Sequence, residues 1–485
     1  MKQGSDFNRG PFATLALYGA MIAAAVTLFI WLSSLGASMA ASSPAKRGIL
    51  GRIGPHEHGA DLFHVLLALL VVLVASRLLG LVFRQINQPP VIGEVIAGLM
   101  LGPSFLGRLA PELSNYILPG SIAPYLGLLA QIGVVLYMFL VGLELDTRLL
   151  RSSAHASLAI SHASIVVPFL LGTTAALWLY PTLAGPGVSF VVFAMFSGLS
   201  LSVTAFPVLA RIVTDSGLQT NRLGAIALSC AAVDDVTAWC LLAVMEGVAR
   251  ARTGDALRTI AFTIAYVGIV FAVVRPIVRR VCARQDELGH ISSTSLAASF
   301  VGLLTSALVT ELIGIHALFG AFLLGAMVPH DSLLARELGR RIKDLVVILL
   351  LPAFFAFTGM RTRLGLIDGF EGWLTCGLIV LIACAGKVGG SAIAARLSGL
   401  GWRDAAGLGV LMNTRGLMEL IVLNIGLEMK IISPALFAMM VVMAIVTTLG
   451  TSPALRALGI SPIPASQHAD ALLADDAAAI VAAKS

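Results

Sequence analysis

Residues 223–245 read LGAIALSCAAVDDVTAWCLLAVM, an apolar stretch that two adjacent acids, Asp234 and Asp235, interrupt near its middle. A helix of this length would cross the hydrocarbon core of a bilayer, which takes about 20 residues. An ionised carboxylate in hydrocarbon costs several kcal/mol, so charges at mid-span mark functional sites. We therefore expect the protein to handle a cation or a proton at these two aspartates.

The rest of the chain shares this apolar character. Of the 485 residues, 58% are hydrophobic and 12% are charged, and the mean hydropathy is +0.94. This composition excludes a water-soluble globule and predicts an all-α polytopic membrane protein in a lipid bilayer. The net charge of +6 lies mostly in arginines of short loops between apolar runs, a pattern of membrane topology, so no nucleic-acid partner is expected.

Apolar runs long enough to span a bilayer recur along the chain. The first lies at about 11–36, and residues 1–40 are expected to form either a signal sequence or a membrane anchor. The other runs are expected at about 60–84, 90–109, 121–143, 156–180, 187–212, 220–248, 257–281, 293–310, 313–329, 343–360, 371–397, 404–426 and 434–450. They predict thirteen transmembrane helices in a domain at 60–455, with a disordered Ala/Asp-rich tail at 458–485.

The two halves of this domain resemble each other weakly. Matching segments are separated by a similar offset that skips an odd number of helices, so the second copy would be inverted in the membrane. Such inverted repeats are typical of secondary transporters. The matches join Gly98–Gly102 to Gly320–Gly325, Phe139–Leu143 to Phe357–Met360, and the interrupted run at Thr204 to that at Thr414.

Two spans contain polar groups that a lipid-facing helix would not tolerate. In residues 200–207 a proline removes a backbone donor while neighbouring hydroxyls can replace its hydrogen bond, which predicts a broken helix. In residues 413–419 an arginine and a glutamate stand four positions apart beside a glycine. Either segment could instead be a helix end at the membrane interface. The residues expected at a crossing of two broken helices are Ser202, Thr204, Pro207, Thr414, Arg415 and Glu419.

Lys387 lies within another apolar span and requires an anionic partner unless it reaches the interface from a helix end. Adjacent helical positions point about 100° apart, so Asp234 and Asp235 cannot face the same way. One carboxylate can pair with Lys387, and the other can face an aqueous funnel and hold a proton or a monovalent cation in turn. A purely structural ion pair would account for one aspartate and leave the other unexplained.

These segments resemble a known family. SVTAFPVLARI at 202–212, AVDDVTAW at 232–239 and NTRGLMELIVLN at 413–424 are similar to the sodium/proton exchanger domain of monovalent cation:proton antiporters, in particular bacterial relatives of the plant and fungal cation/proton exchangers. The resemblance implies a fold with two crossed discontinuous helices beside the aspartate helix. It also implies that Asp235 binds the ion and that Asp234 pairs with Lys387.

The resemblance and the buried charges together predict a secondary antiporter that exchanges Na⁺ or K⁺ for H⁺ by alternating access. Relatives with both aspartates and the lysine are generally electrogenic. The expected protein is a homodimer in the bacterial inner membrane, without a cofactor or enzymatic activity. Its carboxyl terminus lies in the cytoplasm, because most loop arginines then fall on the inner side, although Lys46, Arg47 and Arg52 oppose this orientation. The absence of a soluble tail puts glutathione-gated regulation in doubt.

Three alternatives remain. A sodium-coupled organic-anion symporter uses a similar fold and would show a roomy polar cavity beside the crossing. An intramembrane aspartyl protease needs aspartates in Tyr-Asp and Gly-x-Gly-Asp contexts, and neither context occurs in this chain. A membrane scaffold without transport activity would have no use for an unshared charge in the bilayer.

Overall fold

The structure is a computed structural model, and it describes residues 27–28, 30–31, 58–86, 88–144, 154–218, 221–250 and 256–460. Regular structure in these ranges is helical, with one isolated β-bridge between Ala184 and Ile432. The expected all-α membrane protein is thereby confirmed. The signal or anchor expected at 1–40 and the tail expected at 458–485 lie almost entirely outside the described residues.

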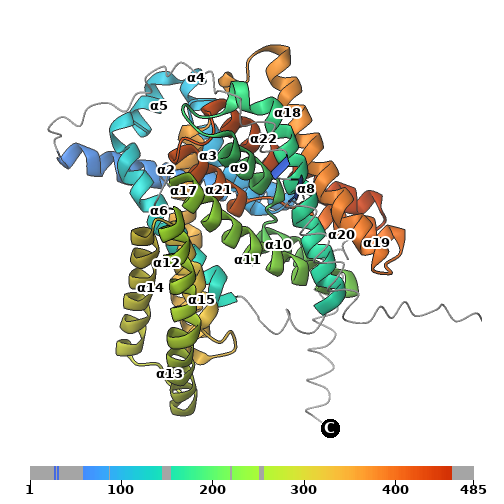
Figure 1. Cartoon of the computed structure of the whole chain (residues 1–485). Helices are drawn as coiled ribbons and strands as arrows, with labels where there is room; N and C mark the ends of the chain where they lie inside the picture. Colours follow the sequence, from blue (N-terminus) through green and yellow to red (C-terminus); the bar gives the residue numbers. More distant parts are fainter. Residues whose placement is uncertain are drawn as a thin grey trace, which may run out of the picture.

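The helices form two groups with dense contacts within each group and sparse contacts between them. We call the first the scaffold group; in Figure 1 its helices α12 to α15 extend toward the lower left. It consists of α2 (His58–Gln85), α3 (Pro90–Leu101), α6 (Ala123–Glu144), α12 (Ala256–Ile269), η2 (Val270–Val274), α13 (Arg275–Leu288), α14 (Ser293–Ile313), α15 (Ala317–Met327), α16 (Leu333–Leu345), η3 (Val346–Leu350) and α17 (Leu351–Arg361).

The second group, which we call the core group, contains the aspartate helix; in Figure 1 its helices α8 and α18 to α20 lie on the right. It consists of α8 (Ala154–Leu183), α9 (Phe190–Ser202), α10 (Phe206–Asp215), α11 (Arg222–Arg250), α18 (Gly369–Cys384), η5 (Ala385–Gly389), α19 (Gly390–Leu397), α20 (Trp402–Met412), α21 (Leu417–Glu428) and α22 (Pro434–Ala457). Short helices connect elements: α4 (Leu106–Leu109), α5 (Pro111–Ile117), η1 (Gly120–Ile122) and η4 (Leu364–Leu366).

Eleven helices in the described ranges are long and apolar enough to cross a membrane, or twelve if α20 and α21, bent by 45°, form one span. The remaining predicted span, at 313–329, forms α15, which has 11 residues. Such a helix is about 16 Å long, roughly half the hydrocarbon thickness. It is short because Gly314, in the left-handed region at φ +97°, separates it from α14 and an extended Val328 ends it.

Glycines allow helices of one repeat to pack closely against helices of the other. On α3, a Cβ at Gly98 would collide with the carbonyl of Phe355 on α17, and one at Gly359 would collide with the carbonyl of Gly98. On the other side, Gly325 of α15 and Gly142 of α6 make the corresponding close contact. The second helix of each repeat therefore packs against the third helix of the other, as expected for two intertwined copies.

This contact predicts that Gly98→Ala lowers the melting temperature in detergent. Overpacking a close helix contact typically costs about 1–3 kcal/mol. The matched control is Gly377→Ala on α18, where nothing lies within 4 Å of the added Cβ, so the better helix propensity of alanine should leave stability unchanged or raised. Equal melting temperatures for the two variants would contradict this packing.

Both predicted broken helices are present. The chain leaves the helical conformation between α9 and α10 at residues 203–205, where Pro207 near the start of α10 lacks a backbone donor to continue the turn. In the second repeat, residues 413–416 separate α20 from α21. Both polar segments therefore interrupt pairs of helices, and their location at mid-membrane stays a prediction.

Candidate ion site

The two breaks meet in the interior of the core group. The backbone N–H of Ala205 donates to the carbonyl of Thr414 at 3.0 Å. The hydroxyl of Thr204 donates to the carbonyl of Met412, the last residue of α20, at 3.2 Å. Thr204 and Thr414 are both fully buried. Each segment thus supplies hydrogen bonds to backbone N–H and C=O groups of the other that lack a partner within a helix. Such bonds make a non-helical backbone tolerable at membrane depth.

Asp234 lies beside this crossing and is saturated with hydrogen bonds. Ser161 donates to its Oδ1 at 2.6 Å. Its Oδ2 accepts from Ser164 at 2.5 Å, from Thr204 at 2.8 Å and from Lys387 Nζ at 3.0 Å. The predicted ion pair between Asp234 and Lys387 is present, and both side chains are at most 1% exposed.

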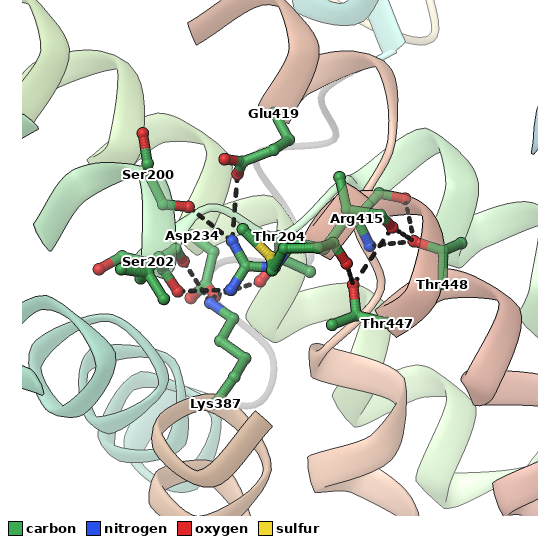
Figure 2. A network of polar contacts seen from close by, with 12 residues as sticks. Ser200, Ser202, Thr204, Asp234, Lys387, Arg415, Glu419, Thr447 and Thr448 are labelled. Carbon is green, nitrogen blue, oxygen red and sulfur yellow. Dashed lines mark hydrogen bonds and ion pairs between the residues drawn. The ribbon is translucent and has the colours of Figure 1, made fainter. Parts of the chain in front are cut away.

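Lys387 approaches the crossing from η5, a turn of π-helix between α18 and α19 (Figure 2). Its ammonium donates to the carbonyl of Ser164 at 3.0 Å, to the carbonyl of Ser202 and to Asp234. An ammonium carries three donors, and each has an acceptor here. Glycines on both sides allow close approach, since a Cβ at Gly386 would lie 2.9 Å from Pro168 on α8.

Arg415 is the second cation at the crossing and is fully buried. Its guanidinium donates to the carbonyls of Ser200 at 2.6 Å and Leu201 at 2.5 Å, and to Glu419 Oε2 at 3.1 Å (Figure 2). Thr448 on α22 holds the Arg415 backbone from both sides, accepting from its N–H and donating to its carbonyl. Arg415 and Lys387 therefore neutralise the last carbonyls of α9, the negative end of that half-helix.

Asp235 differs from every other charge at the site. Its side chain is 3% exposed, and neither carboxylate oxygen has a hydrogen-bond partner of good geometry within the described residues. The backbone amide of Phe206, at the positive end of α10, is directed toward it. The expected aqueous funnel at Asp235 stays a prediction, because the side chain is closed off in this conformation.

The site carries an excess of one negative charge when its five ionisable groups are all charged. Asp234, Asp235 and Glu419 are the anions, and Lys387 and Arg415 are the cations. An uncompensated buried charge is strongly unfavourable. A single proton or a single monovalent cation would neutralise the site, and Asp235 offers the two free oxygens that either would need.

The predicted site residues fall into two sets. The first set contributes side chains at the crossing and consists of Asp234, Asp235, Lys387, Thr204, Arg415 and Glu419. The second set contributes backbone groups there and includes Ser202 and Thr414. Pro207 acts through the start of α10. Sequence reasoning missed Ser161, Ser164 and Thr448. The first two stand three positions apart in α8, a spacing that places both hydroxyls on one face.

Sequence comparison places this arrangement in a family. The model of the family described as "Sodium/hydrogen exchanger, transmembrane" matches residues 60–458. The chain therefore belongs to the sodium/hydrogen exchanger family, a family of membrane transporters. The chain is 43% identical over 403 residues to the Na(+)/H(+) antiporter NhaS4 of Synechocystis sp., covering 83% of this chain and 98% of that protein.

More distant relatives come from plants and yeast. Cation/H(+) antiporter 18 of Arabidopsis thaliana is 38% identical over 395 residues, covering 81% of this chain and 48% of that protein. K(+)/H(+) antiporter 1 of Saccharomyces cerevisiae is 34% identical over 418 residues, covering 84% and 48%. The chain thus spans about half the length of these two relatives.

The fold is similar to that of a solved antiporter. The structure of the sodium proton antiporter MjNhaP1 from Methanocaldococcus jannaschii at pH 8 superimposes with a TM-score of 0.62 at 13% identity, covering 83% of this chain and 100% of that one. At this identity the likeness shows the fold alone, and the expected antiporter fold is confirmed.

Proposed function

We propose that the protein is a secondary active antiporter that exchanges Na⁺ or K⁺ for H⁺, with Asp235 as the carboxylate that holds the proton and the cation in turn. The observation that carries the proposal is a buried carboxylate, Asp235, that no side chain in the described residues contacts by a hydrogen bond, next to an ion pair whose ammonium donors are all engaged. Membership of the exchanger family and the printed names of its relatives support the same activity.

Each site residue has a role in this proposal. Asp235 binds the ion and the amide end of α10 stabilises its ionised form. Asp234 and Lys387 hold α8, α11 and η5 together around the crossing. Thr204 ties the two breaks to Asp234. A proton and a cation compete for one carboxylate, so loading one releases the other, which couples the two fluxes.

Sparse contacts between the two groups support movement of the core group against the scaffold group. Such movement would expose Asp235 to each side of the membrane in turn, as alternating access requires.

We further propose that the protein forms a homodimer through the scaffold group. We place it in the bacterial inner membrane, with a cytoplasmic carboxyl terminus and no enzymatic activity. The exposed apolar residues on α2 and α14, such as Leu66 and Leu304, supply the apolar surface for lipid or a second copy.

The activity is tested in proteoliposomes loaded with a pH-sensitive dye and challenged in turn with Na⁺, K⁺ and Li⁺. A pulse of the transported cation should move protons in the opposite direction, and the ranking of the three cations gives the selectivity. Uptake of an organic anion that requires Na⁺ and runs with it in the same direction, without proton countermovement, would instead support a sodium-coupled organic-anion symporter.

A second prediction is that each exchange cycle moves net charge across the membrane. Exchange of one cation for one proton at Asp235 is electroneutral, so current requires a second proton, for which the Asp234–Lys387 pair is a coupled titratable group. We expect a cation jump to produce a current on a solid-supported membrane. Exchange should also respond to the membrane potential, since a unit charge crossing 100 mV gains about 2.3 kcal/mol. Rapid exchange with no current would indicate one-for-one electroneutral exchange, and Lys387 would then have a structural role only.

A further inference from the structure

Away from the crossing, a polar cluster joins the two groups where α21 ends. Arg361 Nη1, at the end of α17, donates to Asn424 Oδ1 at 3.2 Å and to Glu428 Oε1 at 2.8 Å. Asn424 Nδ2 donates to Thr358 Oγ1 at 2.9 Å. We call these four residues the Arg361 cluster. Thr358 and Arg361 belong to the scaffold group and the other two to the core group, so the cluster bridges groups that otherwise have few contacts.

The cluster lies at the end of the helix that leads away from the ion site. Helix α21 begins beside Arg415 and carries Glu419 in its first turn, and Asn424 and Glu428 follow toward its end. The last two line a cavity of about 30 Å³ with Gln131 and other residues of α6 and α17. This volume holds about one or two water molecules. The guanidinium of Arg361 stacks 4.5 Å over the ring of Phe357, which lines the same cavity.

A second link between the groups reaches the same cavity. Glu246 near the end of α11, in the core group, accepts from the backbone N–H of His316 at 2.7 Å. His316 caps the start of α15, in the scaffold group, and lines the cavity. Glu246 is 1% exposed. Two carboxylates of the core group, Glu246 and Glu428, thus bind residues of the scaffold group near one small cavity with a mainly apolar lining.

We propose that the Arg361 cluster closes the ion route between Asp235 and the membrane face at which α21 ends, with Arg361 as its plug. This inference rests on the proposed antiport function, because antiport requires each face to open in turn. The four side chains then separate in every transport cycle. Withdrawal of Arg361 leaves the carboxylate of Glu428 and the amide oxygen of Asn424 facing the cavity, and hard oxygen atoms are suitable contacts for an entering monovalent cation. In the proposed orientation this is the outer face.

A reversible cross-link tests whether the cluster must open. Thr358→Cys and Asn424→Cys are introduced together after the five native cysteines, none of which is in a disulfide, have been replaced. A short bis(methanethiosulfonate) then joins the two groups across the cluster: each thiolate displaces a sulfinate and forms a disulfide, which a thiol reductant can cleave. We expect cross-linking to stop cation-driven proton flux and a reductant to restore it. Full flux in completely cross-linked protein would overturn the proposal.

The matched control places a cross-link of the same kind within one group. Ser104, in the turn after α3, donates at 2.8 Å to the carbonyl of Thr362, the residue after α17, so this pair links two helices of the scaffold group. Joining Ser104→Cys to Thr362→Cys should therefore leave flux intact. If this control pair joins while the 358–424 pair does not, the two groups do not meet at the cluster in the membrane, and the proposal is also overturned.

A labelling experiment tests the plug without relying on transport. Ile425 lines the cavity and is 3% exposed, so Ile425→Cys should react slowly with a membrane-impermeant maleimide. Adding Arg361→Gln should speed labelling about two- to fivefold, as expected for loss of an ion pair whose side chains are 28% and 29% exposed. Arg363→Gln, which removes a charge two positions away, should not. Equal labelling rates would remove Arg361 from the route even if antiport itself is confirmed, whereas absence of flux in the wild-type protein would refute the proposed function alone.

Discussion

We expect Asp235→Asn to reduce cation-driven proton flux to the rate of protein-free liposomes while the protein stays folded. The substitution keeps the size of the side chain and removes the one carboxylate at the crossing that no side chain in the described residues contacts by a hydrogen bond. Loss of this carboxylate also removes the excess negative charge of the site, so neither a proton nor a cation is needed to neutralise it. The measurement is the dye-monitored ΔpH assay with the preferred cation.

The stability of this variant is equally informative. Within the described residues no side chain donates to Asp235, the asparagine oxygen can still accept from the backbone amide of Phe206, and an ionised carboxylate at 3% exposure is unfavourable. The melting temperature of Asp235→Asn should therefore equal or exceed that of the wild-type protein. Asp344→Asn, at an exposed position near the end of α16, is the matched control and should retain full flux. Near wild-type flux in Asp235→Asn would remove Asp235 from the mechanism.

Lys387→Ala and Asp234→Ala should each destabilise the protein more than the double variant does. Removing one partner of a buried ion pair leaves the other charge uncompensated, with a cost of about 3–5 kcal/mol. Lys387→Ala also deprives the carbonyls of Ser164 and Ser202 of their donor, and Asp234→Ala deprives three hydroxyls of their acceptor.

The measurement is a double-mutant cycle on melting temperature in detergent. A positive interaction between the two sites is expected because the side chains are in direct contact. Asp234→Asn is a useful third variant, since an amide still accepts from Ser161 and Ser164 but carries no charge. Losses that add strictly across the cycle would show that the two charges do not interact in the membrane.

The charged part of the site could be predicted from the sequence because the cost of burying charge is large. Lys387 requires an anionic partner in the bilayer, and the two adjacent aspartates were the candidates; the resemblance to the exchanger family selected Asp234, which contacts Lys387 at 3.0 Å in the structure. The breaks at Thr204 and Thr414 were predicted from a proline and from polar groups where a continuous helix would be apolar. Both conclusions follow from strong local penalties.

Other parts could not be predicted because their partners are weak or lie in the backbone. Serines occur in many membrane helices, so Ser161 and Ser164 gave no signal that separates a ligand of Asp234 from a packing residue. The main acceptors of Arg415 are carbonyls of α9, which no side-chain pattern reveals. The short α15 reads as part of a longer apolar run, and its boundaries depend on the conformation of Gly314 and the capping of its start by His316.

The central claim is that one carboxylate, Asp235, binds the proton and the cation alternately. Proton release upon cation binding measures this directly, by isothermal titration calorimetry of purified protein with Na⁺ or K⁺ in buffers of different ionisation enthalpy. The account predicts that the observed heat depends on the buffer in the wild-type protein, because each bound cation displaces a proton, and that Asp235→Asn gives no binding heat. Cation binding whose heat is the same in every buffer, or binding that persists in Asp235→Asn, would contradict it.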